Sequence, residues 1–229
     1  MTPIYSIILP AWNEEHTVEQ AITQNASFFA SLNQPFEILV IDDGSTDKTP
    51  QKVEQLKQKH SELILIQHSS NQGKGAAIQT GMRAAKGEIR IFQDCDLSVS
   101  PETARQYLSL ETKSDILIGS RRIPGANIAK AQPWIRTQLG TLFNWLIRLK
   151  TGLPYRDTQC GFKIFHARTL PIFEQLRTKG WSFDVELLLR AKQHGFSITE
   201  IPVTWHNGNE SKLRLRDAWK IGKEIYFLE

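Results

Sequence analysis

Short apolar, β-branched runs alternate with polar helical patterns over the first 120 residues of the chain. The apolar runs predict five strands, at Tyr5–Leu9, Phe36–Ile41, Leu63–Gln67, Ile89–Phe92 and Asp115–Gly119. The patterns between them predict helices over roughly 14–31, 50–60, 74–86 and 101–111. Because alternating strands and helices favour βαβ crossovers, we predict an α/β fold with a Rossmann-like, mostly parallel central sheet and helices on both faces.

The pattern becomes less regular after Gly119. Helices are expected near 133–150, 168–178, 183–194 and 213–228, and short strands around Lys163–Phe165 and Ser197–Trp205. Thr49-Pro50 and Ser100-Pro101 each predict an N-cap followed by proline at the first helical position. No Ser- or Gly-rich linker divides the chain, so we predict one domain over residues 1–229, with 119–229 as a helical, basic C-terminal elaboration.

The two halves of the chain differ in net charge. Residues 1–118 hold 10 Lys and Arg against 15 Asp and Glu, a net charge of −5, whereas residues 119–229 hold 18 against 9, a net charge of +9. The remaining composition, with 40% hydrophobic and 23% charged residues, is that of an ordinary globular protein and excludes collagen-like and disordered classes. The asymmetry therefore indicates two halves with different binding partners.

Acidic and polar residues follow three of the predicted strands. The segments are Pro10–Glu15, Asp42–Asp47 and Asp94–Ser98. In open parallel sheets, ligands bind beyond the carboxyl ends of the strands, so we expect these segments to converge on one edge. Any one of them alone is typical of a solvated turn, but three at equivalent strand ends indicate a site.

The pair Asp94 and Asp96 suggests a cation at that edge. In an extended chain residues i and i+2 point the same way, so both carboxylates are expected to face one ion. Hard oxygen ligands from few protein groups suit Mg²⁺ or Mn²⁺, with substrate phosphates completing the coordination shell. An Asp-x-Asp pair by itself usually marks a turn, but this one follows a buried apolar strand.

The cysteines, apolar stretches and histidines of the sequence indicate no disulfide framework, membrane span or metal site. Cys95 and Cys160 are too few for a disulfide framework, which makes a reducing compartment the default. No apolar stretch approaches the ~20 residues that span a bilayer, and no signal-peptide pattern opens the chain. The six histidines show no metal-ligand spacing, and we assign none of them a catalytic role. We therefore expect a cytoplasmic protein.

An ordered series of motifs resembles family 2 glycosyltransferases of the GT-A fold, close to dolichyl-phosphate glucosyl- and mannosyltransferases. The matching segments are Ile8–Glu15, Val40–Asp47, Asn71–Gly75, Gln93–Ser98, Gly119–Arg122, Asp157–Lys163 and Ser211-Lys212. They run in the family's order over nearly the whole chain. Trp12 stands where the family usually has Tyr, Cys95 where it often has Ala, and Ser98 where mannosyltransferase relatives often have Gln, which favours the glucosyl branch.

The resemblance implies a role for each matching residue. The positions that it assigns to nucleotide-sugar binding are Pro10, Trp12, Glu14, Ile41, Asp43, Asp94 and Cys95. Lys74, between two glycines, and Arg121, after the fifth strand, are further candidates for binding the donor phosphates, although the glycines around Lys74 also fit a plain helix start. It assigns the metal to Asp94, Asp96 and Ser98, and the acceptor to Arg136, Asp157 and Gln159. Catalytic roles fall to Asp94, Asp96, Asp184 and Lys212; Asp184, with Glu186, matches the sugar and acceptor pocket. For Asp184 and Glu186 a capping or surface role stays open.

The implied reaction moves a hexose from a nucleotide diphosphate sugar, UDP-glucose or GDP-mannose, to a polyprenyl phosphate with inversion. A phosphate acceptor is already ionised near neutral pH, so no strong general base is required. Ile135, Leu139, Leu142, Leu146 and Leu149 recur at helical spacing with Arg136, Arg148 and Lys150 beside them. Such basic amphipathic patterns suit an anionic membrane surface, so we expect peripheral association with the inner membrane face, although a core helix fits nearly as well.

Other functions remain open on these residues. A GDP-mannose-dependent polyprenyl-phosphate mannosyltransferase and a glycan-elongating family 2 transferase share the motifs. A sugar-nucleotide pyrophosphorylase would need a Gly-rich loop with Arg and Lys, which residues 10–15 lack. A non-catalytic membrane-surface module would explain the +9 half alone. Nucleic acid is not expected as a partner, because no recognised binding motif accompanies the basic half.

Overall fold

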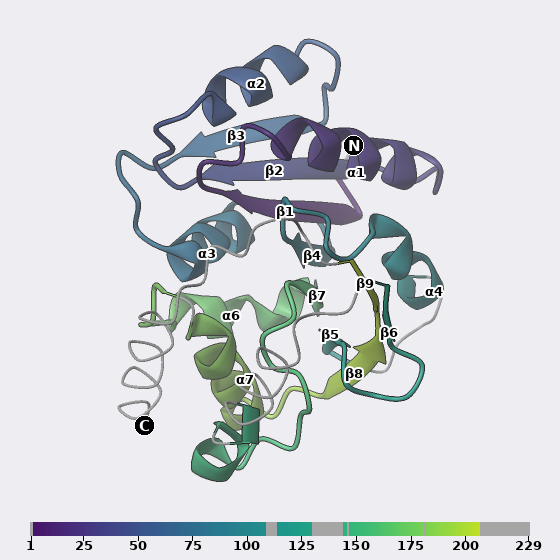
Figure 1. Ribbon diagram of the computed structural model, residues 1–229, viewed down its shortest axis with the longest axis vertical. Coiled ribbons are helices and arrows are strands. Elements are labelled where there is room, and N and C mark those ends of the chain that lie inside the picture. The colour runs from purple at the N-terminus through teal and green to yellow at the C-terminus, as the bar shows by residue number, and fades with distance from the viewer. Residues whose placement is uncertain (1, 109–113, 130–143, 146, 181, 207–229) are drawn as a thin grey trace.

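The computed structural model describes residues 2–108, 114–129, 144–145, 147–180 and 182–206. A seven-stranded sheet in the order β3-β2-β1-β4-β7-β5-β8 forms the centre, and Figure 1 shows it running from β3 at the top to β8 at the bottom. Its strands are β1 Tyr5–Ala11, β2 Phe36–Asp42, β3 Leu63–Gln67, β4 Ile89–Gln93, β5 Ile116–Ser120, β7 Phe162–His166 and β8 Ile198–Pro202. A second, two-stranded sheet pairs β6 Asn127–Ile128 with β9 Thr204–Trp205. The predicted α/β fold with a mostly parallel sheet is confirmed.

Strand direction decides which residues meet at the functional edge. Six of the seven central strands run parallel, and β7 alone is antiparallel to its neighbours β4 and β5. Consequently the carboxyl ends of β1, β2, β4 and β5 share one edge with the beginning of β7. The register pairs Gln93 with Phe162, so the residues just before β7 lie beside those just after β4.

Helices cover both faces of the sheet, as the pattern predicts. They are α1 Val18–Ala30, α2 Thr49–Leu56, α3 Lys74–Ala84, α4 Arg105–Leu108, α6 Leu170–Glu174 and α7 Phe183–Gln193, with 3-10 turns at Pro101–Ala104 and Ala167–Thr169. In β1, Ile7 and Leu9 pack in the core that contains α1 and α2, whereas Ile8 packs in the core that contains α3, α6 and α7. Alternate side chains of a strand point to opposite faces, so each strand serves both layers.

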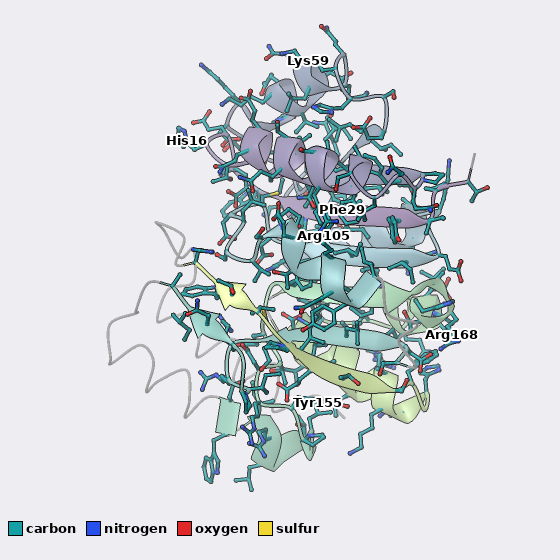
Figure 2. The ribbon with its side chains drawn as sticks, turned by 90° about the vertical axis from the view of Figure 1, so that its right-hand side faces the viewer. His16, Phe29, Lys59, Arg105, Tyr155 and Arg168 are labelled. Carbon is teal, nitrogen blue, oxygen red and sulfur yellow. The ribbon has the colours of Figure 1, made fainter. Side chains whose placement is uncertain are left out.

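The packing of α1 shows how strongly one layer is held. Phe29 is 1% exposed, and its ring centroid lies 5.6 Å from that of Tyr5 and 6.0 Å from that of Phe36. Arg105 on α4 reaches across to the same helix, with its guanidinium 5.0 Å from the centroid of Phe28 (Figure 2). Burying one such aromatic side chain contributes about 1.5–3 kcal/mol.

Several predicted boundaries are wrong for local reasons. Lys48, and not Thr49, is the N-cap of α2, because the Asp47 carboxylate accepts from both the amide and the hydroxyl of Thr49. The helix expected over 168–178 stops at Glu174, because the chain beyond it is bound by a buried carboxylate described below. The strand expected over Ser197–Trp205 divides into β8 and β9, which join different sheets. At Ser100 the predicted cap is confirmed, since its hydroxyl accepts from the amide of Glu102.

Parts of other predicted helices lie outside the described residues. These are the end of 101–111, most of 133–150 and all of 213–228. Residues 144–145 and 147–151 are helical, as expected for that stretch. No helix within the described part of the chain is both long and apolar enough to span a bilayer.

Candidate active site

Two loops at the carboxyl ends of β1 and β2 hold each other in place. The amide of Glu14 donates to Thr49 Oγ1 over 2.8 Å, and the amide of Asn13 donates to Ser45 Oγ over the same distance. Asn13, at a φ of +53°, returns a contact when its side-chain oxygen accepts from the amide of Thr46. This mutual bracing fixes the loop that carries the predicted base-binding residues, and it leaves the indole of Trp12 44% exposed beside them.

The carboxylate of Asp43 is buried and makes several hydrogen bonds. Its Oδ1 lies 2.7 Å from Nδ1 of His68 and accepts from the amide of Gln72, while Oδ2 accepts from the amide of Gly73. Nε2 of His68 contacts Thr80 Oγ1 at 2.9 Å. The carboxylate therefore shapes the loop that leads into α3. Sequence reasoning missed His68, although its place directly after β3 could have signalled a role at this edge.

Lys74, at the start of α3, forms an ion pair with Asp94, which directly follows β4. Nζ of Lys74 lies 2.6 Å from Oδ1 of Asp94 and 5.2 Å from the centroid of the Phe92 ring. Burial lowers the pKa of Lys74, but the carboxylates of Asp94, Asp184 and Asp96 raise it by more, so the ammonium stays charged. The ammonium of Lys74 is therefore paired with Asp94, a carboxylate that the sequence predicts as a metal ligand.

Gly161, just before β7, leaves space that the Asp94 carboxylate uses. The amide of Asp94 donates to the carbonyl of Gly161 over 3.1 Å. A Cβ added at Gly161 would lie 1.9 Å from Oδ2 of Asp94 and 2.5 Å from its Cγ. The backbone of β7 therefore forms the floor on which this carboxylate rests, and only glycine leaves room for it there.

The segment after β4 is a turn and not the extended chain that we expected. The amide of Leu97 donates to the carbonyl of Asp94, and Leu97 has a φ of +52°. Asp96 is exposed, and its carboxylate accepts from the amide and the hydroxyl of Ser98 at 2.9 and 2.8 Å. Cys95 points the other way: its Sγ is buried and donates to the carbonyl of Pro10. The turn still places both carboxylates at one loop, by a geometry different from strand alternation.

The donor atoms of this loop fit a hard divalent cation. Asp94, Asp96 and Ser98 offer carboxylate and hydroxyl oxygens, the ligands that Mg²⁺ and Mn²⁺ accept. In the described part of the chain, no three His, Cys, Asp or Glu side chains form a cluster that could hold a metal. Two carboxylates with one hydroxyl suit an ion that shares its shell with substrate phosphates.

Arg121 and Asp157, predicted for the donor and the acceptor respectively, bind each other. Nε and Nη2 of Arg121 donate to the two carboxylate oxygens at 2.6 and 2.9 Å, and the Arg121 amide adds a third bond. Burial of Asp157 would raise its pKa, but Arg121 pulls that pKa below its ordinary value. The guanidinium also lies 5.7 Å from the ring of Trp205 and keeps 26% of its side chain exposed. A bidentate pair of this kind fixes the orientation of the arginine.

A second buried pair joins Lys163 of β7 to Asp184 of α7. The two groups lie 2.5 Å apart, and Nζ of Lys163 also donates to the carbonyl of Cys160 over 2.7 Å. Lys163 is 0% exposed, and its ammonium lies 5.5 Å from the Phe92 ring. Burial raises the pKa of Asp184, and Lys163 with Lys74 opposes that rise. A lysine inside the apolar run Phe162–Phe165 was the signal for this pair in the sequence.

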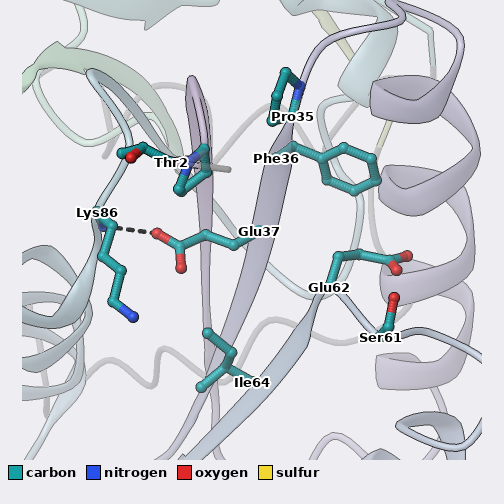
Figure 3. Close-up of a pocket in the computed structure, with 9 residues that line it drawn as sticks. Thr2, Pro35, Phe36, Glu37, Ser61, Glu62, Ile64 and Lys86 are labelled. Atoms are coloured by element: carbon teal, nitrogen blue, oxygen red, sulfur yellow. Dashed lines mark hydrogen bonds between the residues drawn. The ribbon is translucent and has the colours of Figure 1, made fainter.

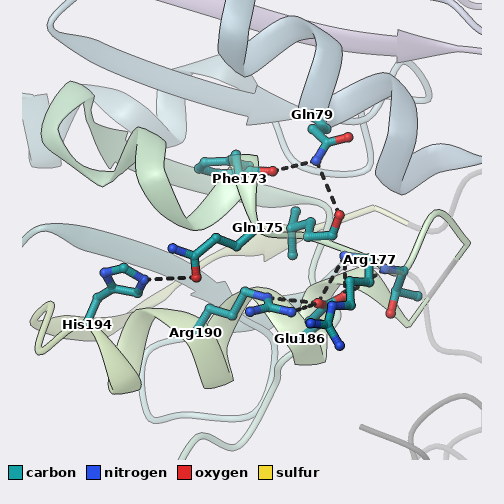
Figure 4. A network of polar contacts seen from close by, with 9 residues as sticks. Gln79, Phe173, Gln175, Arg177, Glu186, Arg190 and His194 are labelled. Carbon is teal, nitrogen blue, oxygen red and sulfur yellow. Dashed lines mark hydrogen bonds and ion pairs between the residues drawn. The ribbon is translucent and has the colours of Figure 1, made fainter. Parts of the chain in front are cut away.

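Glu186 is 2% exposed, so the surface role left open for it is wrong. Its carboxylate accepts from the amides of Arg177 and Thr178 and pairs with Arg190 at 2.5 Å (Figure 4). Burial would raise the pKa of Glu186, but these hydrogen bonds lower it below its ordinary value. By binding the two amides, Glu186 ends α6 and forms the loop that faces the start of α3.

Two further predicted residues, Pro10 and Gln159, lie in the described part of the chain. Pro10 pairs in register with the buried Ile41, and Gln159 is half-buried in the turn before β7. Burial raises the pKa of Cys160 to about 12, so its thiol stays protonated at neutral pH. Arg136 and Lys212 lie outside the described residues.

A hollow of about 580 Å³ lies at the opposite, amino-terminal edge of the sheet (Figure 3). Its lining includes Glu37, whose carboxylate accepts from the amide of Lys86 and from the hydroxyl of Ser6, both at 2.6 Å. These bonds tie β1 and β2 to the loop before β4. The hollow is separate from the acidic loops, which all lie at the other end of the strands.

Comparison with known proteins agrees with this geometry. The profile of glycosyl transferase family 2 matches residues 6–172. Dolichyl-phosphate beta-glucosyltransferase of Saccharomyces cerevisiae is 32% identical over 244 residues, covering 97% of this chain and 73% of the relative.

Solved structures show the same fold at lower identity. Glucosyl-3-phosphoglycerate synthase from Mycobacterium tuberculosis, in complex with Mn²⁺ and UDP-glucose, has a TM-score of 0.70 at 18% identity and covers 98% of this chain and 77% of that one. The mannosyltransferase PcManGT from Pyrobaculum calidifontis, in complex with GDP-mannose and Mn²⁺, has a TM-score of 0.62 at 20% identity, with 97% and 61% covered. Together with the family match and the yeast relative, the α/β architecture shows that this chain is an enzyme of glycosyl transferase family 2.

Proposed function

We propose that the protein transfers glucose from UDP-glucose to a polyprenyl phosphate of the dolichyl type. The observation that carries the proposal is the match of nearly the whole chain to dolichyl-phosphate beta-glucosyltransferases, at 32% identity in yeast and 29% in Homo sapiens. Among the described residues, those that would hold a nucleotide, a cation and an acceptor lie at the same sheet edge. This arrangement supports a transferase over a non-catalytic surface module.

The donor would bind across the loops after β1, β2 and β4. Trp12 offers an exposed ring on which a base can stack, and hydrogen bonds at Glu14 and Asp43 hold the loops of this sheet edge in place. Asp94, Asp96 and Ser98 would hold Mg²⁺ or Mn²⁺ against the donor diphosphate. The bound ion would supply positive charge against the negative charge that develops on the leaving nucleotide.

This chain's own cations and carboxylates would do the rest. Lys74 lies close enough to Asp94 to reach a diphosphate held there, and Arg121 adds positive potential from a fixed position. Asp184, held by Lys163, would orient the acceptor phosphate, whose oxygen attacks the anomeric carbon from the face opposite the leaving group. Configuration is thereby inverted, without a strong base. Gln159, with Arg136 and Lys212 outside the described residues, completes the proposed acceptor and diphosphate contacts.

A donor and acceptor screen tests the proposal. Purified protein is incubated with UDP-glucose or GDP-mannose and a short polyprenyl phosphate, with Mn²⁺, with Mg²⁺, or with a chelator, and the glycolipid is quantified. We expect metal-dependent product from UDP-glucose. Product from GDP-mannose but not from UDP-glucose would show that GDP-mannose is the donor. Turnover only on a sugar acceptor would indicate a glycan-elongating enzyme. The absence of any metal-dependent donor binding would refute the transferase site.

We also propose that the enzyme works at the cytoplasmic, inner face of a membrane, attached peripherally through an exposed helix. Trp145 and Leu149 lie one turn apart and are 55% and 69% exposed, and the exposed Arg148 and Lys150 flank them. Aromatic and apolar side chains among basic ones suit an anionic lipid surface.

Vesicle sedimentation tests that surface. The protein should sediment with anionic vesicles at low salt, and Leu149→Glu should weaken binding severalfold. Ile128→Glu is the matched control, because Ile128 is also exposed, at 48%, but lies on β6. Vesicle binding that changes neither with lipid charge nor with salt would refute the membrane surface assigned to Trp145 and Leu149. Binding that both variants weaken equally would also refute it.

A further inference from the structure

The beginning of α3 is held in one position by two glycines. Gly73 adopts a φ of +101°, and a Cβ there would lie 2.4 Å from the carbonyl oxygen of Lys179. At Gly75 a Cβ would lie 2.7 Å from the carbonyl oxygen of Thr178, and its amide donates to the carbonyl of Lys179. Lys74 stands between these two contacts. Its backbone is therefore fixed, and the movement open to it is that of its long side chain.

That side chain ends on a carboxylate that the proposed cation would need. Nζ of Lys74 lies 2.6 Å from Oδ1 of Asp94, while Oδ2 of the same group faces Gly161. The pair is partly open to solvent, with 17% of the Lys74 side chain and 30% of the Asp94 side chain exposed. A divalent cation on Asp94 would bring a second positive charge close to the Lys74 ammonium, and the two would repel each other, so they compete for the negative charge of this carboxylate.

Resting on the proposed function, we propose that Lys74 is an exchangeable cation, which occupies Asp94 in the donor-free enzyme and moves to the diphosphate when the donor binds. A diphosphate brings several negative oxygens to the same place and so offers the ammonium a replacement partner. Asp94 then becomes available to the metal. Because the donor removes the competitor of the metal, donor and metal must bind cooperatively, and each must tighten the other by the same factor.

An exchangeable Lys74 and a permanent salt bridge predict different effects of removing the Lys74 side chain. In Lys74→Met the metal no longer displaces an ammonium, so its affinity for the donor-free protein should rise. The donor has no competitor left to remove, so the factor by which it tightens metal binding should fall. If Lys74 instead stayed on Asp94 after the donor had bound, that factor would not change.

The experiment measures Mn²⁺ binding, and needs no turnover. Free Mn²⁺ is titrated by electron paramagnetic resonance with and without UDP, for wild type, Lys74→Met, Lys74→Arg and Lys86→Met. Lys86 lies two residues beyond the far end of α3, an 11-residue helix about 16 Å long. It is exposed and controls for the loss of one positive charge. Circular dichroism confirms that each variant is folded.

We expect UDP to tighten Mn²⁺ binding to the wild type by about 10- to 100-fold, within the usual range of coupling between sites. Lys74→Met should bind Mn²⁺ about 10-fold more tightly without UDP and lose most of the enhancement, which corresponds to about 1.4 kcal/mol per tenfold change. Lys74→Arg and Lys86→Met should resemble the wild type. An unchanged enhancement in Lys74→Met would overturn the exchange while leaving the proposed function intact. A wild type that binds neither UDP nor Mn²⁺ would instead overturn the donor site itself.

Discussion

Replacing Gly161 with alanine would disturb the predicted metal ligand and little else. The added Cβ would lie 1.9 Å from Oδ2 of Asp94, whereas ordinary van der Waals contact begins at 3.4 Å. Gly161 cannot retreat easily, because its carbonyl binds the Asp94 amide and Phe162 is in register with Gln93 on β4. Its backbone does not occupy the left-handed region, so alanine adds no conformational strain. The carboxylate must therefore move, by more than about 1 Å.

A displacement of that size has a calculable effect on the reaction. Misplacing a positioned group by about 1 Å can lower the rate about 100-fold, or about 2.7 kcal/mol in transition-state stabilisation. We expect Gly161→Ala to lower kcat/KM for UDP-glucose on this order, and to raise the Mn²⁺ concentration at half-maximal activity. The pair between Asp94 and Lys74 should lengthen in a crystal structure of the variant.

Gly87 provides the matched control. A Cβ there would lie 2.6 Å from Oγ of Ser6, but at the opposite edge of the sheet. Gly87→Ala should lower the melting temperature while leaving kcat/KM of the folded enzyme near that of the wild type. The assay is initial-rate kinetics at several Mn²⁺ concentrations together with thermal unfolding. Full activity with an unchanged Mn²⁺ requirement in Gly161→Ala would refute the proposal that the backbone at Gly161 positions the Asp94 carboxylate.

Other variants separate the functional carboxylates from the structural ones. Asp96 is exposed, so Asp96→Ala should leave the melting temperature nearly unchanged and lower transfer at least about 100-fold in the same kinetic assay; full transfer would remove it from the metal site. Arg121→Ala leaves the carboxylate of Asp157, which is 0% exposed, without its guanidinium, and should cost about 3–5 kcal/mol in urea unfolding. Because the pKa of Asp157 is lowered in the folded protein, its stabilisation is complete above the unfolded-state value of about 3.9 and is lost as the pH falls through the lower folded value. Unfolding free energies from pH 7 to pH 2 should show this loss, and Asp157→Asn should lack it; identical pH slopes would contradict the assignment.

The sequence predicts this sheet well because its strands are short apolar runs between turn residues. The first five runs each became a strand within two residues of the expected ends, and the GT-A expectation is confirmed. Strand direction is a different matter. The run Lys163–Phe165 shows where a strand lies, but not that β7 runs antiparallel between β4 and β5. Hydrophobic periodicity carries no information on direction when both faces of a strand are buried.

The candidate site was predictable as a set of loops but not as a set of contacts. The carboxyl ends of parallel strands converge by topology, which placed Asp43 and Asp96 at one edge. The partners of these groups come from distant segments: Arg121 binds Asp157, 36 positions away, and Lys163 binds Asp184, 21 positions away. Such pairs depend on which distant segments pack together, and hydrophobic periodicity does not show this. Glu186 illustrates this, since it ends α6 from a later helix.

The two halves of the chain differ in net charge by 14, yet the described ion pairs at the site do not join one half to the other. Lys74 binds Asp94 within the acidic half, and Arg121 binds Asp157 within the basic half. Magnitudes distinguish the two pairs. Breaking a buried pair costs about 3–5 kcal/mol, whereas a pair open to solvent contributes about 0–1 kcal/mol. Asp157 is fully buried and Asp94 is 30% exposed, so Lys74 is the cation that a diphosphate can draw away, while Arg121 acts from a fixed position.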